Sequence, residues 1–371
     1  MSRRLTVHTH SVDYPIIFEK GGLDRIGMLI GERLPAVKKV LIVSDETVTG
    51  LYMGRAVTAL REAGLDVSTC AVPAGEASKS QKFLFHLYDV LHQSGITRTD
   101  LLVALGGGVV GDLTGYAAAS WLRGCSWVQI PTTLLAMTDS SVGGKTGIDL
   151  PFGKNLVGAF WHPSLVVADT ELLSTLAPVE WAQGMAEVIK YGCIRDADLL
   201  RDLEEGRADM DQVICRCVEI KRDIVEADEF DRGERMLLNF GHTIGHAIEK
   251  AGHYTIQHGS AVAIGMVAAT ILGEKLGVTP VGLSQRIARI LIKNGLPTFT
   301  TFTGEELAAS MLKDKKNLGG AVHFILLKDI GEAVIHPIAP TELSGLLDDV
   351  LRQAEAISPV GGVSEQRTDT V

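Results

Sequence analysis

Short apolar runs alternate with longer amphipathic segments through the first half of the chain. Four runs rich in apolar and β-branched residues predict strands, at 40–44 (VLIVS), 67–72, 101–105 (LLVAL) and 127–130. Between them, apolar residues recur at helical spacing over 48–63 and 80–92. Strands that alternate with helices of this length are typical of βαβ units around a mostly parallel sheet. We therefore predict an α/β domain over residues 1–175.

After residue 176 the pattern becomes mostly helical. Apolar residues at helical spacing predict helices over 176–194, 210–227, 234–250, 258–276 and 283–294. One hairpin is predicted, with strands 322–327 and 333–338 around the Ile330–Gly331 turn. We expect a mostly α-helical domain over 176–355, followed by a polar, glycine-containing tail over 356–371 that is disordered.

Composition excludes several classes of protein. Hydrophobic residues make up 46% of the chain and charged residues 22%, as in ordinary globular proteins. The net charge of −10, without a long basic stretch, disfavours binding to nucleic acid. The longest uncharged apolar stretch, 261–273, is shorter than the roughly 20 residues of a membrane span. An odd number of cysteines, five, and a start without an apolar signal segment favour a cytoplasmic location with reduced thiols.

A glycine-rich turn follows the predicted strand 101–105. Gly106, Gly108 and Gly111 match G-x-G-x-x-G where a strand passes into a helix, which is the context of a dinucleotide-binding turn. The alternative is a tight turn without a ligand. No strand about 20 residues further on ends in Asp or Glu, so we expect a variant of the usual arrangement.

A second polar and glycine-rich segment spans 139–155. Its Gly144-Lys145-Thr146 ends like a phosphate-binding loop, but Asp139 stands where the first glycine of that loop should be. A nucleoside-triphosphate loop is therefore disfavoured. Lysines flanked by glycines still suit an anionic ligand.

The second half carries a stripe of functional side chains. Arg235, Asn239, His242 and His246 are spaced 4, 3 and 4 apart, so one continuous helix would place them on one face. Upstream, Glu187 and Lys190 share a helix face. Two histidines and a carboxylate form an open catalytic metal site in many enzymes. Taken alone, the H-x-x-x-H spacing favours His242 and His246 as the metal pair, although a single histidine is more often a hydrogen-bonded or surface residue.

Seven motifs in order resemble 3-dehydroquinate synthase, a sugar-phosphate cyclase family. They are GGGVVGD (106–112), RGCSWVQIPTTLLAMTDSSVGGKTGID (123–149), GKN (153–155), AEVIKYG (186–192), LLNFGHTIGHAIE (237–249), HGSAVAIGM (258–266) and DKK (314–316). The likeness extends over about 38–340. Ser260 stands where Glu is frequent, and Ala321 where Lys is common. The resemblance implies an N-terminal NAD-binding domain, a C-terminal metal-binding domain, an active site in the cleft between them, and a homodimer.

The resemblance also implies roles for individual residues. The metal ligands, for zinc or cobalt, become Glu187, His242 and His258, and His246 becomes a proton-handling substrate contact. NAD contacts are implied for Asp45, Glu76, Lys79, Gly107, Gly108, Asp112, Thr132, Thr133, Lys154 and Thr175. Substrate contacts are implied for Asp139, Lys145, Asn155, Lys190, Lys221, Arg235, Asn239, His246 and one of Lys315 and Lys316. Arg123 is implied to reach the substrate phosphate in the other subunit.

The implied reaction converts 3-deoxy-D-arabino-heptulosonate 7-phosphate to 3-dehydroquinate and phosphate in the shikimate pathway. It proceeds by transient NAD-dependent oxidation, β-elimination of phosphate, re-reduction, ring opening and intramolecular aldol closure. The alternatives are a related cyclase acting on an amino analogue or on sedoheptulose 7-phosphate, a metal-dependent dehydrogenase of the glycerol dehydrogenase kind, and a non-catalytic NAD-binding protein. The last would have a broken site, whereas every position named above holds a chemically competent residue.

Overall fold

The computed structural model describes residues 3–315 and 320–358, and these residues form two compact units. Unit 1 comprises the chain up to Trp181 together with Ile214–Asp231. Unit 2 comprises Ala182–Val213 and the described residues from Arg232 onward. This division differs from the expected boundary at residue 175, because the chain returns to unit 1 for part of one helix and the segment after it. Residues 359–371 of the expected tail lie outside the described residues.

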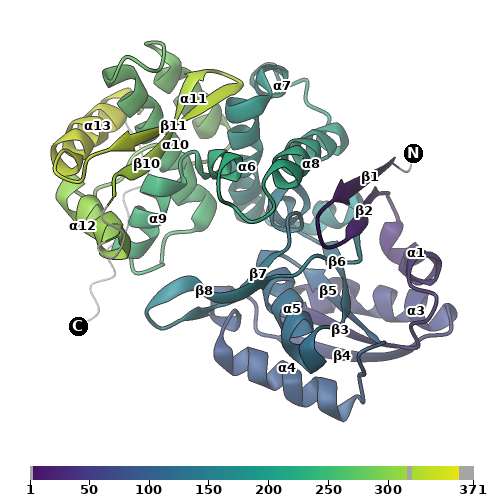
Figure 1. The fold of residues 1–371 in the computed structure, drawn as a ribbon. Helices are drawn as coiled ribbons and strands as arrows, with labels where there is room; N and C mark the ends of the chain where they lie inside the picture. The colour runs from purple at the N-terminus through teal and green to yellow at the C-terminus, as the bar shows by residue number, and fades with distance from the viewer. Residues whose placement is uncertain (1–2, 316–319, 359–371) are drawn as a thin grey trace. The chain divides into compact units, whose positions relative to one another are not determined.

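Unit 1 is built on a seven-stranded sheet in the order β1-β2-β9-β6-β5-β3-β4 (Figure 1). Only the β1–β2 pair is antiparallel, and the other five pairs are parallel. The four strands predicted from the apolar runs are confirmed, whereas the two N-terminal strands and β9 were not predicted. The strands are β1 (Arg3–His8), β2 (Asp13–Phe18), β3 (Lys39–Asp45), β4 (Asp66–Val72), β5 (Leu101–Gly106), β6 (Ser126–Pro131) and β9 (Leu165–Ala168).

Helices cover the central strands of this sheet. Leu41 and Val43 of β3 pack in one core with Leu84 of α4 (Gln81–Gln93) and Leu113 of α5 (Gly108–Ser120). The helices α1 (Ile26–Arg33) and α3 (Gly54–Glu62) pack on each other and contact β9 and β4 (Figure 1). The predicted helix 48–63 is in fact a short α2 (Glu46–Val48), a π-helical turn (Thr49–Met53) and α3. The α/β class predicted for the first half is confirmed.

The strand order places a switch point between β3 and β5. From β3 the chain moves outward to β4, then crosses back to β5 and continues through β6 to the other side. The helices that follow β3 and β5 therefore diverge at this point. In parallel α/β sheets, ligands bind beyond the carboxyl ends of the strands at such a point.

A second hairpin in unit 1 overlaps the polar and glycine-rich segment 139–155. The strands β7 (Lys145–Leu150) and β8 (Gly153–Phe160) pair antiparallel, with Gly147 opposite Gly158. A Cβ atom on Gly158 would lie 2.1 Å from the carbonyl oxygen of Thr146, so only glycine permits this pairing. The hairpin begins at Lys145, one of the expected substrate contacts.

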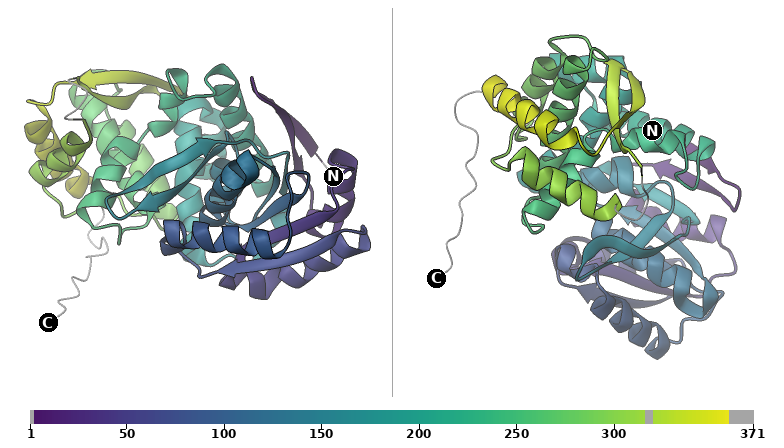
Figure 2. Two further views of the ribbon diagram at one scale, coloured as in Figure 1. Left: turned by 60° about the horizontal axis from the view of Figure 1, so that its bottom comes forward. Right: turned by 60° about the vertical axis from the view of Figure 1, so that its left-hand side comes forward.

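Unit 2 consists mainly of helices with one small hairpin. The predicted helices 176–194, 210–227, 258–276 and 283–294 and the predicted hairpin are confirmed within two residues at each end. Figure 2 shows the hairpin beside the helices, and α12 packs on α13. The elements of unit 2 are α6 (Pro178–Arg195), α7 (Ala197–Glu205), η7 (Glu234–Asn239), α9 (His242–Ala251), α10 (His258–Lys275), α11 (Leu283–Lys293), α12 (Gly304–Lys315), β10 (Val322–Asp329), β11 (Glu332–Ile338) and α13 (Leu343–Ile357). The helix α8 (Met210–Ala227) starts in unit 2, but most of it belongs to unit 1, which includes Ile214–Asp231.

The predicted continuous helix over 234–250 is wrong. A 3₁₀ helix, η7, ends at Asn239, and α9 begins at His242. Gly241 between them has φ of 81°, a left-handed conformation that breaks the helical path. A Cβ atom there would lie 2.7 Å from the carbonyl oxygen of Val262 in α10, so the turn also needs glycine for close packing.

Within the parts of the chain that the structure describes, no helix has both the length and the apolar character to cross a bilayer.

Candidate NAD and metal sites

The glycine-rich turn lies at the switch point of unit 1. Strand β5 ends at Gly106, Gly107 precedes the first turn of α5, and Gly108 is the first helical residue. A Cβ atom on Gly107 would lie 3.2 Å from the Thr133 side chain, and one on Gly108 would lie 3.1 Å from Ser140 Oγ. The bare backbone here leaves the N–H groups at the start of α5 available to an anionic ligand such as a pyrophosphate.

The other expected NAD contacts of unit 1 follow the same edge of the sheet. Asp45 ends β3 and accepts a hydrogen bond from the Val48 N–H at 3.0 Å. Thr132 follows β6, and its N–H donates to the carbonyl of Gly106 at 3.0 Å. Thr175 lies beyond β9, with its hydroxyl 2.5 Å from that of Tyr52. The carboxyl ends of parallel strands lie at the same edge of a sheet. These residues therefore lie along that one edge.

The buried Lys79 connects the carboxyl edge of the sheet to the β7–β8 hairpin. Lys79 is 5% exposed, and its Nζ lies 2.5 Å from a carboxylate oxygen of Asp112 in α5. Lys79 also donates to the side-chain oxygen of Asn155 in β8. Burial alone would lower the pKa of Lys79, but the Asp112 carboxylate outweighs it and raises the pKa above its usual value. The ammonium group therefore stays charged at neutral pH. Nearby, Lys154 pairs with Glu76 at 3.9 Å.

Two further lysines of unit 1 have carboxylate partners. The Lys221 ammonium, on α8, contacts both the side chain and the backbone carbonyl of Asp139. Lys145, at the start of β7, lies 2.5 Å from a carboxylate oxygen of Asp231. Asp231 was not singled out from the sequence. It lies in the segment that returns to unit 1, which sequence spacing does not indicate.

In unit 2, three side chains converge as a candidate metal centre. Glu187 comes from α6, His242 from the first residue of α9, and His258 from the first residue of α10. One donor atom from each lies within 4.8 Å of the others. The Nε2 atoms of both histidines lie 3.5 Å from the same Glu187 oxygen, Oε1. One carboxylate and two imidazoles are a donor set that suits a divalent ion with open positions.

The remaining nitrogens of both imidazoles are already engaged. His242 Nδ1–H donates to the carbonyl of Phe240 at 3.1 Å, and His258 Nδ1–H faces a carboxylate oxygen of Glu249 at 3.4 Å. Such partners fix the ring orientation and the tautomer, and leave Nε2 as the ligand atom. Glu249 was not singled out from the sequence, although it lies seven residues after His242, which is two helical turns. These contacts show that the residues fit a metal ion.

The two histidines differ in their protonation. Burial lowers the pKa of His242 to about 3, so its Nε2 lone pair is free of a proton at neutral pH. Burial also acts to lower the pKa of His258, but hydrogen bonds to Glu187 and Glu249 outweigh it and raise that pKa to about 9. The two carboxylates thus favour a positive charge here, whether a proton or a metal ion.

The pairing of His242 with His246 favoured by spacing is not the closest arrangement. The two rings are 5.4 Å apart, against 5.2 Å between His242 and His258, and His246 is exposed. A second possible group of donors contains His246, Glu249 and His258. This second group shares His258 with the first group. Its Glu249 faces Nδ1 of His258, whereas Glu187 faces Nε2 of the same ring.

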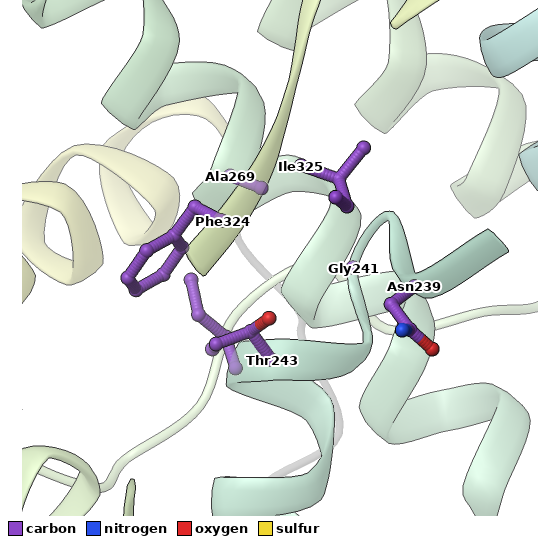
Figure 3. A pocket seen from close by; sticks show the side chains of 7 residues that line it. Asn239, Gly241, Thr243, Ala269, Phe324 and Ile325 are labelled. Atoms are coloured by element: carbon purple, nitrogen blue, oxygen red, sulfur yellow. The ribbon is translucent and has the colours of Figure 1, made fainter. Parts of the chain in front are cut away.

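Packing of α9 against α10 brings the histidines together. A Cβ atom on Gly265 would lie 1.9 Å from the carbonyl oxygen of Gly241, so the two helices touch through bare backbone. A small hollow lies beside the Gly241 turn and is lined by Asn239, Gly241, Thr243, Ile244, Ala269, Phe324 and Ile325 (Figure 3). The hydroxyl of Thr243 donates to the carbonyl of His323 at 3.2 Å, which links α9 to β10.

Gln183 links the two helices that carry Glu187 and His258. Its side-chain oxygen accepts the N–H of Ser260 at 3.0 Å, and its amide nitrogen lies 3.1 Å from the Ser260 hydroxyl. The N–H group satisfied here is one of those left open in the first turn of α10. Gln183 lies one turn before Glu187, so it connects the start of α10 to the ligand-bearing part of α6.

The other expected substrate contacts are distributed over both units. In unit 2, Lys190 is buried and pairs with Glu187, and Arg235 is 2% exposed. Because of the break at Gly241, Arg235 and Asn239 do not share a helix with the histidines. In unit 1, Arg123 is exposed with φ of 66°. The side chain of Lys315 and the whole of Lys316 lie outside what the structure describes.

Comparison with known proteins identifies the family. Residues 69–183 match the family model "3-dehydroquinate synthase N-terminal", and residues 184–317 match "3-dehydroquinate synthase C-terminal". A 3-dehydroquinate synthase from Neisseria gonorrhoeae is 44% identical over 351 residues, covering 92% of this chain and 97% of that protein. One from Enterococcus faecalis is 43% identical, covering 94% and 99%.

A solved structure supports the same conclusion. The fold is similar to that of 2-deoxy-scyllo-inosose synthase complexed with carbaglucose-6-phosphate, NAD⁺ and Co²⁺, with a TM-score of 0.83 and 25% identity, covering 94% of this chain and all of that one. The seven motifs, the NAD-type turn and the cluster of Glu187 with two histidines thus agree with the sequence matches. The chain belongs to the 3-dehydroquinate synthase family.

Proposed function

We propose that this protein converts 3-deoxy-D-arabino-heptulosonate 7-phosphate to 3-dehydroquinate and phosphate, as a phosphorus–oxygen lyase that uses NAD and one divalent metal ion. The observation that carries the proposal is the donor cluster of Glu187, His242 and His258. The Nδ1 atoms of both histidines already have partners, Phe240 and Glu249, so that both Nε2 atoms are left to bind a metal. Membership of the 3-dehydroquinate synthase family supports the substrate and the reaction.

The NAD site is proposed on unit 1. Its residues would be those at the carboxyl edge of the sheet, with the pyrophosphate at the start of α5. Bound NAD supplies reversible acceptance of a hydride, so that one substrate hydroxyl is oxidised and later restored. Lys79, held charged by Asp112, would contribute a fixed positive charge next to this edge. The proposed contacts are Asp45, Glu76, Lys79, Gly107, Gly108, Asp112, Thr132, Thr133, Lys154 and Thr175.

The metal site is proposed on Glu187, His242 and His258, with zinc or cobalt as the ion. A divalent ion there supplies Lewis acidity that polarises a carbonyl and lowers the pKa of a bound hydroxyl. Phe240 and Glu249 hold the two imidazoles in the orientation that such binding needs. His246, exposed beside the cluster, is proposed to hold and move a proton of the substrate.

The substrate would be held mainly by cationic side chains. A phosphate and a carboxylate on one small molecule call for several positive charges, and charge-assisted hydrogen bonds to them are strong. We propose that the charged contacts are Lys145, Lys190, Lys221 and Arg235, with Asp139, Asn155 and Asn239 as polar contacts. Arg123 of a second subunit is proposed to reach the phosphate, which requires a homodimer. A cytoplasmic location is part of the same proposal, and it is supported by five cysteines that are all thiols.

Phosphate release by the purified protein tests the proposal. With NAD and zinc or cobalt, the acid sugar phosphate should give phosphate over many turnovers while the absorbance of NADH shows no net growth. One NADH formed per product would instead support a dehydrogenase. Faster turnover of sedoheptulose 7-phosphate or of an amino analogue would identify a related cyclase.

A further inference from the structure

Lys145 follows a turn that is packed tightly on one aromatic side chain. Gly143 and Gly144 have φ of 97° and 65°, and the N–H of Trp161 donates to the Gly144 carbonyl at 2.8 Å. A Cβ atom on Gly144 would lie 2.7 Å from Nδ1 of His162. The backbone that leads into Lys145 therefore lies directly against the His162 ring.

The ring of His162 is itself fixed on two sides. Its Nε2 lies 2.9 Å from a carboxylate oxygen of Glu229, and both side chains are only 2% exposed. Its face stacks on Tyr14, with ring centroids 5.6 Å apart, and the Tyr14 hydroxyl accepts the N–H of Gly143 at 3.2 Å. The turn and the ring are thus connected through Tyr14 as well as by direct contact.

Glu229 is the centre of this arrangement, which we call the Glu229 cluster (His10, Ser11, Tyr14, His162 and Glu229). Its second carboxylate oxygen accepts the His10 backbone N–H at 2.8 Å and lies 3.0 Å from His10 Nδ1. The Ser11 hydroxyl donates at 3.3 Å to Oε1 of Glu229, the oxygen that also faces His162. Burial alone would raise the pKa of Glu229, but the hydrogen bonds from His10 and His162 outweigh it and lower the pKa to about 2.

Glu229 also lies two residues before the carboxylate that contacts Lys145. Asp231 has φ of 59° and an oxygen 2.5 Å from Lys145 Nζ, although the lysine side chain is half exposed. A lysine side chain on the surface can adopt many rotamers, so holding its ammonium in one place requires fixed neighbours. The segment anchored by Glu229 supports the backbone of Lys145 through His162 and its ammonium through Asp231.

We infer that the buried Glu229–His162 pair is a positioning device for Lys145, which sets where this ammonium meets the anionic substrate. The inference rests on the proposed function, because it takes Lys145 as a substrate contact. Neither Glu229 nor His162 touches substrate in this proposal. His162 acts through the Gly143–Gly144 turn, and Glu229 acts through His162 and through the segment that carries Asp231.

A double-mutant cycle between His162 and Lys145 tests the inference. Lys145→Ala should lower kcat/KM for the acid sugar phosphate by about 10- to 150-fold, as expected for the loss of one charged contact. His162→Ala should lower it by about 5- to 50-fold, with most of the change in KM for the sugar phosphate. The double variant should be no worse than Lys145→Ala alone, because His162 would act only through the lysine. The dissociation constant for NAD should change less than threefold in each.

Two further variants separate positioning from general stability. His162→Gln keeps an N–H donor that can reach Glu229, and it should recover most of the lost kcat/KM. Gly144→Ala leaves the pair intact but drives a methyl group into the His162 ring, and it should raise KM as His162→Ala does. As a matched control, Asp100→Asn alters another buried carboxylate of unit 1, which accepts hydrogen bonds from the N–H groups of Lys39 and Thr97. It should lower stability without raising KM.

The outcomes distinguish the inference from the function on which it rests. If Lys145→Ala turns over normally, the role of Lys145 in the proposed function is wrong. If Lys145→Ala is impaired but the effects of His162→Ala and Lys145→Ala multiply, or His162→Ala lowers only stability, the positioning role is overturned. Should His162→Ala fail to fold, Gly144→Ala decides: an unchanged KM overturns the inference.

Discussion

Arg235 is the residue that bears most directly on the choice of substrate. It is 2% exposed and lies in unit 2, four residues before Asn239 and seven before His242, one of the proposed metal ligands. The guanidinium group is a planar fork that matches a carboxylate through two hydrogen bonds. Sedoheptulose 7-phosphate has a hydroxymethyl group where the proposed substrate has its carboxylate.

We expect Arg235→Leu to lower kcat/KM for the acid by roughly 10- to 150-fold, the loss of a charged contact worth about 1.5–3 kcal/mol. The loss should be much smaller for a neutral sugar phosphate, because nothing in that molecule requires the guanidinium. Phosphate release measured with both substrates checks this. Unchanged turnover of the acid by the variant would contradict the assignment of Arg235.

Glu249 gives a second prediction at this scale. Its carboxylate faces His258 Nδ1 at 3.4 Å, and carboxylate partners of this kind increase the basicity of a metal-bound imidazole. Glu249→Gln should weaken zinc or cobalt binding by about 10- to 100-fold in competition with a chelator. Glu274→Gln serves as the control, because Glu274 accepts the Ser284 N–H at the far end of α10. Equal metal affinity in wild type and Glu249→Gln would show that this carboxylate does not support the metal.

At the scale of elements, the close packing of α9 on α10 determines how the two histidines of the proposed metal site meet. The first residues of these helices are His242 and His258, and a Cβ atom on Gly265 would lie 1.9 Å from the Gly241 carbonyl oxygen. Separating the two helices would therefore also move the two imidazoles apart.

Gly265→Ala should destabilise the protein by about 1–3 kcal/mol, the usual cost of overpacking, and should weaken metal binding as well. Gly345→Ala in α13 is the matched control, because a Cβ atom there meets nothing within 4 Å. Urea unfolding with and without metal checks both variants. If Gly265→Ala is as stable as Gly345→Ala, the packing contact is not as tight as the structure indicates.

The Glu229 cluster connects separate elements of unit 1, and its contribution should depend on pH. The pKa of Glu229 is lowered from 4.5 to about 2 in the folded chain, so the ionised form is favoured by folding. The stabilisation is complete above pH 4.5 or so and disappears as the pH falls through about 2. Glu229→Gln should cost up to about 3 kcal/mol at pH 7 and far less at pH 2. Urea unfolding at a series of pH values measures this, and a cost that does not vary with pH would contradict it.

For the whole molecule, activity should require one divalent ion per chain. Prolonged chelation should abolish phosphate release, and zinc or cobalt should restore it, because the donors of Glu187, His242 and His258 converge on one point. Elemental analysis provides the stoichiometry. Full activity in a preparation shown to be free of metal would rule out the proposed metal site.

The sequence determined much of the architecture through local patterns. Apolar runs such as 101–105 predict strands because a parallel strand is buried on both faces, and β5 is buried at every position. The exposed and intermediate positions of β8 give no such run, so the β7–β8 hairpin was not predicted. Motif order identified the family, and with it the residues proposed for NAD, metal and substrate.

Only the tertiary structure decided how these residues meet. Spacing on one helix favoured His242 with His246, whereas the fold brings His258 from another helix and Glu187 from a third into one cluster. The helix that spacing assumes is broken at Gly241, where close packing against α10 demands a left-handed turn. Glu229 joins His10 and His162 for the same reason: residues more than 60 positions apart meet only when the sheet and its surrounding elements have formed. Local sequence determines the elements, but contacts between distant segments depend on how those elements pack.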